Sequence, residues 1–200
     1  HRSSAAYAQP GRTRMVTRLV LFVGASLILG YVSKASLSQP RSHGFYRFLA
    51  WESILALVLL NFRGFALWFG DPLCLRQLMS WVLLTGSIVP VTWGAHLLRT
   101  RGRPKAARDD RRLFEFEKTT QLVTAGVFKY VRHPLYSSLL LLAWGVFLKR
   151  PSGPGGGLAL CATALLVATA KAEESENRQY FGTAYDTYMR DTKMFIPFVL

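Results

Sequence analysis

The fold is decided by the run from Leu78 to Leu98, which reads LMSWVLLTGSIVPVTWGAHLL and contains no Asp, Glu, Lys or Arg. A helix needs roughly 20 apolar residues to cross the hydrocarbon core of a bilayer. Backbone polar groups in lipid have to be satisfied within the segment itself, so a spanning run of this kind is helical. The run therefore predicts a transmembrane helix.

Two further long apolar blocks precede this run. Met15–Val32 carries a charge only at Arg18, near its start, and Phe48–Phe69 contains Glu52 and Arg63. Both blocks are close to the length of a membrane span. Charged side chains inside a span are costly and usually face a cavity or a partner, so we hypothesise that Glu52 contacts a substrate.

Two shorter apolar blocks follow, Leu135–Leu148 and Leu158–Ala170. The segment Lys149–Gly157 between them is rich in proline and glycine and predicts a break in helical structure. We interpret the two blocks as a helical hairpin lengthened by flanking residues; a pair of buried helices in a soluble domain is the alternative. Together the five blocks predict an all-α, multi-pass transmembrane helical bundle of about five membrane helices with a C-terminal helical hairpin.

The composition agrees with a membrane protein. Half of the 200 residues are hydrophobic and 18% are charged, yet 25 Lys and Arg against 11 Asp and Glu give a net charge of +14. This hydrophobicity argues against disorder and against a soluble nucleic-acid binder, the usual interpretation of so basic a chain. Cys74 and Cys161 lie far apart and indicate neither a disulfide framework nor a metal site.

The basic residues predict an orientation. With five spans, the loops 34–47 and 99–134 and the C-terminal tail share one face and carry most of the Lys and Arg. The positive-inside rule places that face in the cytosol, although four arginines in residues 1–18 act in the opposite direction. The loop 99–112 would lie beside anionic membrane lipids. We expect the endoplasmic reticulum membrane for a eukaryotic chain and the plasma membrane for a bacterial one.

Polar residues concentrate in two stretches on this predicted cytosolic face, 114–136 and 171–188. The hairpin connects the two stretches, and each meets the membrane surface at an open end of that hairpin. They should therefore lie close together in space.

Each polar residue has a plain structural explanation when taken alone. Pro134 suits the first turn of a helix, where its missing N–H costs nothing. Tyr130 and Tyr136 suit the membrane interface, and Glu173 and Glu174 suit a solvated helix end. Taken together, two carboxylates, an imidazole, a guanidinium and several tyrosines at the mouth of an apolar bundle suit a charged, amphipathic small molecule.

Two motifs add a family resemblance. Val123–Phe128 reads VTAGVF and Tyr130–Tyr136 reads YVRHPLY, and the pattern continues to Ile196-Pro197 through the Glu pair and Phe181-Gly182. Residues 113–198 thereby resemble the methyltransferase core of the isoprenylcysteine carboxyl methyltransferases and their phospholipid-methyltransferase relatives. The chain then divides into a basic N-terminal segment 1–14, transmembrane helices with a basic cytosolic loop at 15–112, and a membrane methyltransferase core at 113–200.

The resemblance implies a cofactor, S-adenosyl-L-methionine, bound without a Rossmann fold. Arg132 and Glu174 are the candidate catalytic residues that it implies. The implied cofactor-binding positions are Thr120, Gln121, Leu122, Val123, Phe128, His133, Pro134, Leu135, Tyr136 and Glu173.

Two positions depart from the family pattern. Phe128 stands where the family often has a tyrosine near the adenosine. Thr169 stands where the isoprenylcysteine enzymes place an arginine for the substrate carboxylate, so Arg178 or Arg132 would have to replace it.

Methyl transfer from a sulfonium is a direct displacement that depends mainly on alignment of the reacting atoms. A carboxylate acceptor needs no base, whereas an amine acceptor needs one, for which Glu173, Glu174 or His133 are candidates. The leading hypothesis is a membrane methyltransferase for a lipidic or prenylated acceptor, with isoprenylcysteine-type carboxyl O-methylation ahead of phospholipid or small-amphipath methylation. A non-catalytic membrane subunit is the alternative from another class; no metal and no nucleic acid are expected.

Overall fold

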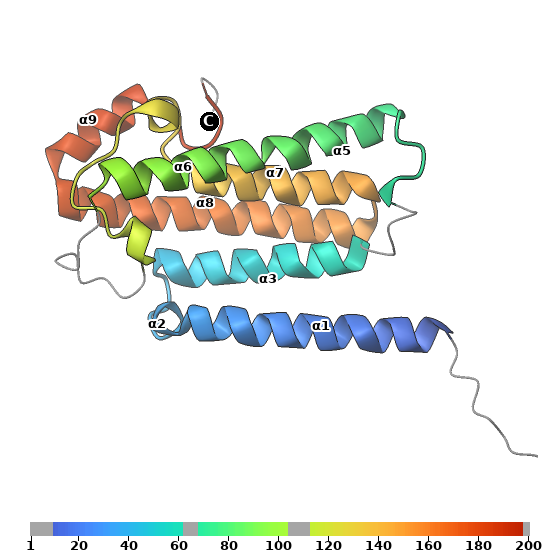
Figure 1. Ribbon diagram of the computed structural model, residues 1–200. Coiled ribbons are helices and arrows are strands. Elements are labelled where there is room, and N and C mark those ends of the chain that lie inside the picture. Colours follow the sequence, from blue (N-terminus) through green and yellow to red (C-terminus); the bar gives the residue numbers. More distant parts are fainter. Residues whose placement is uncertain (1–9, 62–67, 104–112, 198–200) are drawn as a thin grey trace, which may run out of the picture.

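A computed structural model describes residues 10–61, 68–103 and 113–197, and within these ranges the chain is a bundle of helices without β-strands (Figure 1). The predicted all-α membrane bundle is confirmed: four helical stretches are long and apolar enough to span a membrane, and α7 is a shorter apolar helix. The helices are α1 Pro10–Val32, α2 Lys34–Leu37, α3 His43–Asn61, α5 Leu75–Gly86, α6 Ile88–Arg101, α7 Pro134–Lys149, α8 Gly153–Phe181 and α9 Thr183–Asp191, with the 3-10 turns η1 Glu115–Glu117 and η2 Gly126–Lys129.

The core forms where α3 and α7 pack on α8. Four buried residues recur on one face of α8 at helical spacing: Ala159, Ala162, Leu166 and Ala170. Three of them are small, and small side chains let membrane helices approach closely. In contrast, α1 lies at the outer edge of the bundle beside α3 (Figure 1).

The span predicted at Leu78–Leu98 is confirmed and extended, because Leu75–Arg101 forms one candidate span. It is made of α5 and α6, with a break at Ser87. Pro90 lies in the first turn of α6 and has no N–H to donate to the carbonyl of Gly86, which accounts for an interruption at this point.

The predicted hairpin is present, but its turn is shorter than the predicted break over Lys149–Gly157. α7 includes Lys149, and α8 already begins at Gly153. The Ser152 side chain accepts a hydrogen bond from the Gly155 N–H at 3.2 Å and caps the helix. Pro154 then occupies the first turn, where proline is tolerated. A capped N-terminus therefore lets the glycine run continue the helix.

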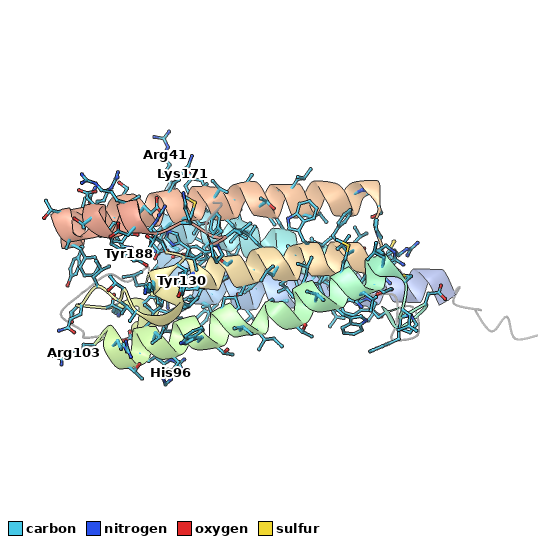
Figure 2. All side chains as sticks on the ribbon, turned by 90° about the horizontal axis from the view of Figure 1, so that it is seen from above. Arg41, His96, Arg103, Tyr130, Lys171 and Tyr188 are labelled. Carbon is cyan, nitrogen blue, oxygen red and sulfur yellow. The ribbon has the colours of Figure 1, made fainter. Side chains whose placement is uncertain are left out.

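The polar stretches gather at one end of the bundle, which we call the site end. α2, η1 and α9 all lie there (Figure 1). Figure 2 shows His96, Arg103, Tyr130 and Tyr188 in this same half of the molecule. Contacts between residues 132 and 174 confirm that the two stretches meet, as the hairpin predicted.

Candidate functional site

The segment before α7 is fixed by the C-terminal residues. Val131 and Lys193 form a parallel β-bridge, and the Arg132 N–H donates to the Lys193 carbonyl at 2.8 Å. The His133 N–H donates to the Met194 carbonyl at 3.1 Å. α7 then begins at Pro134, as predicted. These backbone bonds hold the His133 side chain in place at the mouth of the bundle.

Both predicted acids flank one imidazole. His133 is buried; its Nδ1 lies 3.8 Å from Glu173 Oε2, and its Nε2 lies 3.2 Å from Glu174 Oε1. The ring of Tyr136 stacks on the imidazole with centroids 5.5 Å apart. The Tyr136 hydroxyl donates to Glu173 Oε2 at 2.5 Å. Glu173 therefore has two polar partners that fix its orientation.

Arg132 and Glu174 form an inner ion pair beside this cluster. Arg132 Nε donates to Glu174 Oε1 at 2.7 Å, and the side chains of both residues are nearly buried. Arg132 Nη1 also donates to the carbonyl oxygens of Met189 and Thr192. The guanidinium thus ties α8 to the chain just after α9.

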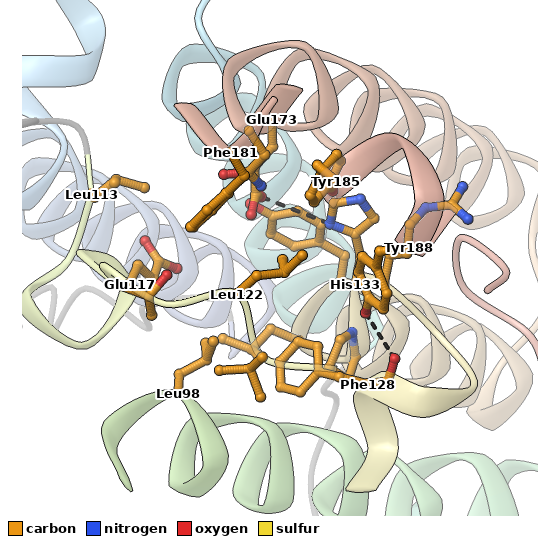
Figure 3. Close-up of a pocket in the computed structure, with 17 residues that line it drawn as sticks. Leu98, Leu113, Glu117, Leu122, Phe128, His133, Glu173, Phe181, Tyr185 and Tyr188 are labelled. Atoms are coloured by element: carbon orange, nitrogen blue, oxygen red, sulfur yellow. Dashed lines mark hydrogen bonds and ion pairs between the residues drawn. The ribbon is translucent and has the colours of Figure 1, made fainter. Parts of the chain in front are cut away.

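A pocket with about 660 Å³ of empty space, part of it open to solvent, lies in front of Glu173 (Figure 3). Its walls come from α6, residues 113–128, the start of α7, the end of α8 and α9. The lining residues are Leu98, Leu113, Glu117, Thr119, Leu122, Val123, Phe128, Arg132, His133, Pro134, Leu135, Tyr136, Glu173, Asn177, Phe181, Tyr185 and Tyr188.

Most of the predicted site positions line this pocket. These are Leu122, Val123, Phe128, Arg132, His133, Pro134, Leu135, Tyr136 and Glu173. Thr120, Gln121 and Glu174 are not among its walls. The backbone N–H groups of Thr120 and Gln121 donate to the Gly102 carbonyl, at 3.0 and 3.2 Å. Both residues thus tie the pocket loop to the end of α6.

Sequence reasoning missed several walls of the pocket. Glu173, Asn177 and Phe181 follow one another at intervals of four residues, which places them on one face of α8. That spacing was a signal that could have found the last two. Tyr185 and Tyr188 line the pocket from α9, and burial raises the pKa of both phenols.

A second, mostly apolar cavity of about 560 Å³ of empty space adjoins the first. Glu117, Leu135 and Tyr136 line both, so these side chains separate the two spaces. The other walls of the second cavity are Arg47, Trp51, Val91, Phe114, Phe116, Ser138 and Leu139.

A buried ion pair, Arg47–Glu117, lies at this boundary, and sequence reasoning named neither residue as a site residue. Arg47 Nη1 donates to Glu117 Oε2 at 2.8 Å and to Oε1 at 3.1 Å. The Phe114 N–H also donates to Glu117 Oε2, at 3.0 Å. The guanidinium carbon lies 4.5 Å from the ring centroid of Phe114 and 5.3 Å from that of Trp51, a cation–π arrangement.

Of the two charged residues inside the predicted second span, the structure describes Glu52. Glu52 Oε2 accepts a hydrogen bond from Ser26 Oγ on α1 at 2.6 Å, and Glu52 lines neither cavity. The hypothesis that Glu52 contacts a substrate finds no support here. Arg63 lies outside the described residues. Among the residues that the structure describes, no cluster of His, Cys, Asp and Glu is suited to a metal ion.

One comparison with known proteins found a similarity. Residues 108–184 match the family model described as phospholipid methyltransferase, and this confirms the predicted family resemblance over that segment. No curated protein and no solved structure matches the chain. The matched residues include all of α7 and α8 and most walls of the pocket. The match supports a membrane methyltransferase that acts on lipid-like substrates.

Proposed function

We propose that the protein transfers a methyl group from S-adenosyl-L-methionine to a lipidic acceptor. The observation that carries this proposal is Glu173, a carboxylate held by Tyr136 and His133 at the wall of a pocket inside the matched segment. A fixed carboxylate at the mouth of an apolar bundle suits the binding of a small cation that reacts with a lipid.

The pocket fits the two unlike parts of this cofactor. Glu173 offers negative charge for the positively charged end, and Phe181 and Tyr185 add aromatic faces beside it. Leu98 and Phe128 supply apolar surface for an adenine ring. The cofactor, when bound, supplies an electrophilic methyl group on a sulfonium.

The chain's own residues bind and orient the reactants. Because a sulfonium leaves as a neutral thioether, alignment supplies much of the rate and little acid catalysis is needed. We infer that Arg132 and Glu174, the candidate catalytic residues, act as positioning residues. Their ion pair fixes His133, and through it the segment that lines the pocket.

The second cavity suits the apolar chain of the acceptor. Its head would reach the shared boundary at Glu117 and Tyr136, next to the cofactor pocket. We propose that this site end faces the cytosol, as the distribution of Lys and Arg favours. We also keep residues 113–200 as the proposed methyltransferase core, since the C-terminal segment holds His133.

Isoprenylcysteine-type carboxyl O-methylation and phospholipid methylation are the two candidate reactions. For a carboxylate acceptor, Thr169 supplies no charge, and its hydroxyl donates to the Leu165 carbonyl. Arg132 is tied to Glu174, and Arg178 pairs with Asp186 at 2.9 Å on the exposed side of α8. Neither arginine replaces the family's carboxylate-binding residue. The family description favours a phospholipid acceptor.

The decisive experiment is a calorimetric titration of the detergent-purified protein with S-adenosyl-L-methionine. We expect binding in the parent chain and a loss of about tenfold or more in Glu173→Gln, since hydrogen bonds to charged groups contribute about 1.5–3 kcal/mol. Glu52→Gln is the matched control, because it neutralises a carboxylate outside both cavities. Absence of binding in the parent protein would reject the proposal.

The acceptor is then identified by transfer of labelled methyl groups. A prenylated cysteine and phosphatidylethanolamine serve as parallel acceptors in the same detergent. Label on the first supports carboxyl O-methylation, and label on the second supports phospholipid N-methylation. Cofactor binding without label on either lipid would contradict both acceptor assignments.

A further inference from the structure

Arg47 is placed where an acceptor headgroup would arrive. It extends from α3, outside the segment matched to the family, and lines the apolar cavity with Trp51 and Phe114. Among the described residues around that cavity, Arg47 carries the positive charge. Arginine is suited to planar, bidentate recognition of carboxylates and phosphates, and its weak hydration suits a buried aromatic setting.

Glu117, the ion-pair partner of Arg47, lies at the boundary between the two cavities. Glu117 lines both the apolar cavity and the first pocket, so this residue borders both spaces. The Phe114 N–H holds Glu117 Oε2 independently of Arg47. Glu117 therefore keeps a hydrogen-bond donor when the guanidinium turns to another anion.

We propose that Arg47 binds the anionic group of the acceptor lipid, a carboxylate or a phosphodiester, and that Glu117 is its counterion only until the acceptor arrives. The inference rests on the proposed function for the identity of the two ligands. It assigns this role to α3 because Arg47 lines the apolar cavity, whereas Arg132 and Arg178 do not.

Charge balance links the cofactor to the replacement of Glu117 by the acceptor anion as the partner of Arg47. Removing one member of a buried ion pair is strongly destabilising, because the other charge is left uncompensated. A cationic methyl donor in the first pocket would add positive charge to a space that Glu117 also lines. Arg47 then accepts an anion without leaving Glu117 unpaired. Cofactor and acceptor anion should consequently strengthen each other's binding, by the same factor in both directions.

The test measures binding of two anionic probes, the phosphodiester methyl dodecyl phosphate and the carboxylate dodecanoate, to the full chain in an uncharged detergent. We expect Arg47→Gln to weaken binding of the preferred probe by about tenfold or more, while cofactor affinity changes by less than about threefold. Preference for one probe distinguishes a phosphodiester from a carboxylate source. Glu52→Gln, on the same helix but outside both cavities, should bind as the parent does. Parental probe affinity in Arg47→Gln would overturn the inference.

Glu117→Gln gives a result of opposite sign and keeps the test decisive where Arg47→Gln does not fold. It removes the internal competitor, so the anionic probe should bind more tightly, and the cofactor should no longer enhance that binding. Weaker or unchanged probe binding would overturn the inference. A parent chain that binds the probe through Arg47 but does not bind S-adenosyl-L-methionine would instead reject the proposed function alone.

Discussion

Buried cations occur at both ends of the bundle, and their partners differ. At the end away from the site, Lys149 donates to Gln77 Oε1 at 2.9 Å, and its Nζ lies 3.4 Å from the ring centroid of Trp81. None of these partners is a carboxylate. At the site end, Arg47 and Arg132 each pair with a glutamate.

The partners distinguish a cation that is enclosed by protein from cations that border a pocket. Lys149 is enclosed by side chains and carbonyl oxygens, and it lines neither cavity. Arg76 reinforces the same end by donating to the last carbonyls of α7, Leu148 and Lys149, both at 2.6 Å. The site-end arginines border pockets, where an incoming ligand can exchange for one partner. We therefore treat the paired charges beside the pockets as functional candidates and the enclosed Lys149 as a structural one.

The largest effect is expected at the site end, in Arg132→Gln. This change leaves Glu174 as a buried carboxylate without its cation and removes the donor to the carbonyls of Met189 and Thr192. Breaking a buried pair costs about 3–5 kcal/mol. Thermal unfolding followed by circular dichroism should show this loss.

A matched control is Arg178→Gln, because the Arg178–Asp186 pair is largely exposed. Exposed pairs contribute about 0–1 kcal/mol, so this variant should unfold close to the parent temperature. Equal losses in the two arginine variants would contradict the distinction between buried and exposed pairs.

A smaller effect is expected at the opposite end, in Lys149→Met. The methionine keeps an apolar stem against Trp81, but Gln77 loses its donor. An unsatisfied buried acceptor costs about 1–3 kcal/mol. We expect that loss in thermal unfolding, with unchanged calorimetric affinity for S-adenosyl-L-methionine. A cofactor affinity that falls with stability would show that the two ends are coupled.

The sequence predicts the fold well because membrane spans are long apolar runs that need no knowledge of tertiary contacts. The boundaries were less predictable. The run Gly153–Gly157 is helical because the Ser152 cap and Pro154 start the helix locally. Composition alone indicates a break there, and it does not reveal that a local cap starts a helix at this point.

The site was predictable where chain topology brings residues together. A hairpin returns the chain to the same membrane face, so His133 and Glu173 could be expected to meet. Arg47 and Glu117 are 70 positions apart and belong to no common motif. Their contact depends on how α3 packs beside the pocket loop, which no local pattern encodes.

The smallest effect is expected when a single hydroxyl-to-carbonyl hydrogen bond is removed at either end of the bundle. Tyr188 Oη donates to the Phe128 carbonyl at 2.7 Å beside the pocket, and Ser80 Oγ donates to the Gly145 carbonyl at 2.7 Å far from it. Tyr188→Phe and Ser80→Ala should each cost about 0.5–1.5 kcal/mol in unfolding.

Because burial raises the pKa of Tyr188, its hydroxyl remains a donor, and the loss in Tyr188→Phe should stay constant from about pH 6 to about pH 9. Tyr188 lines the pocket and Ser80 does not, so Tyr188→Phe alone should also weaken cofactor binding. Weakened binding in Ser80→Ala, or parental binding in Tyr188→Phe, would contradict the assignment of this end of the bundle as the site.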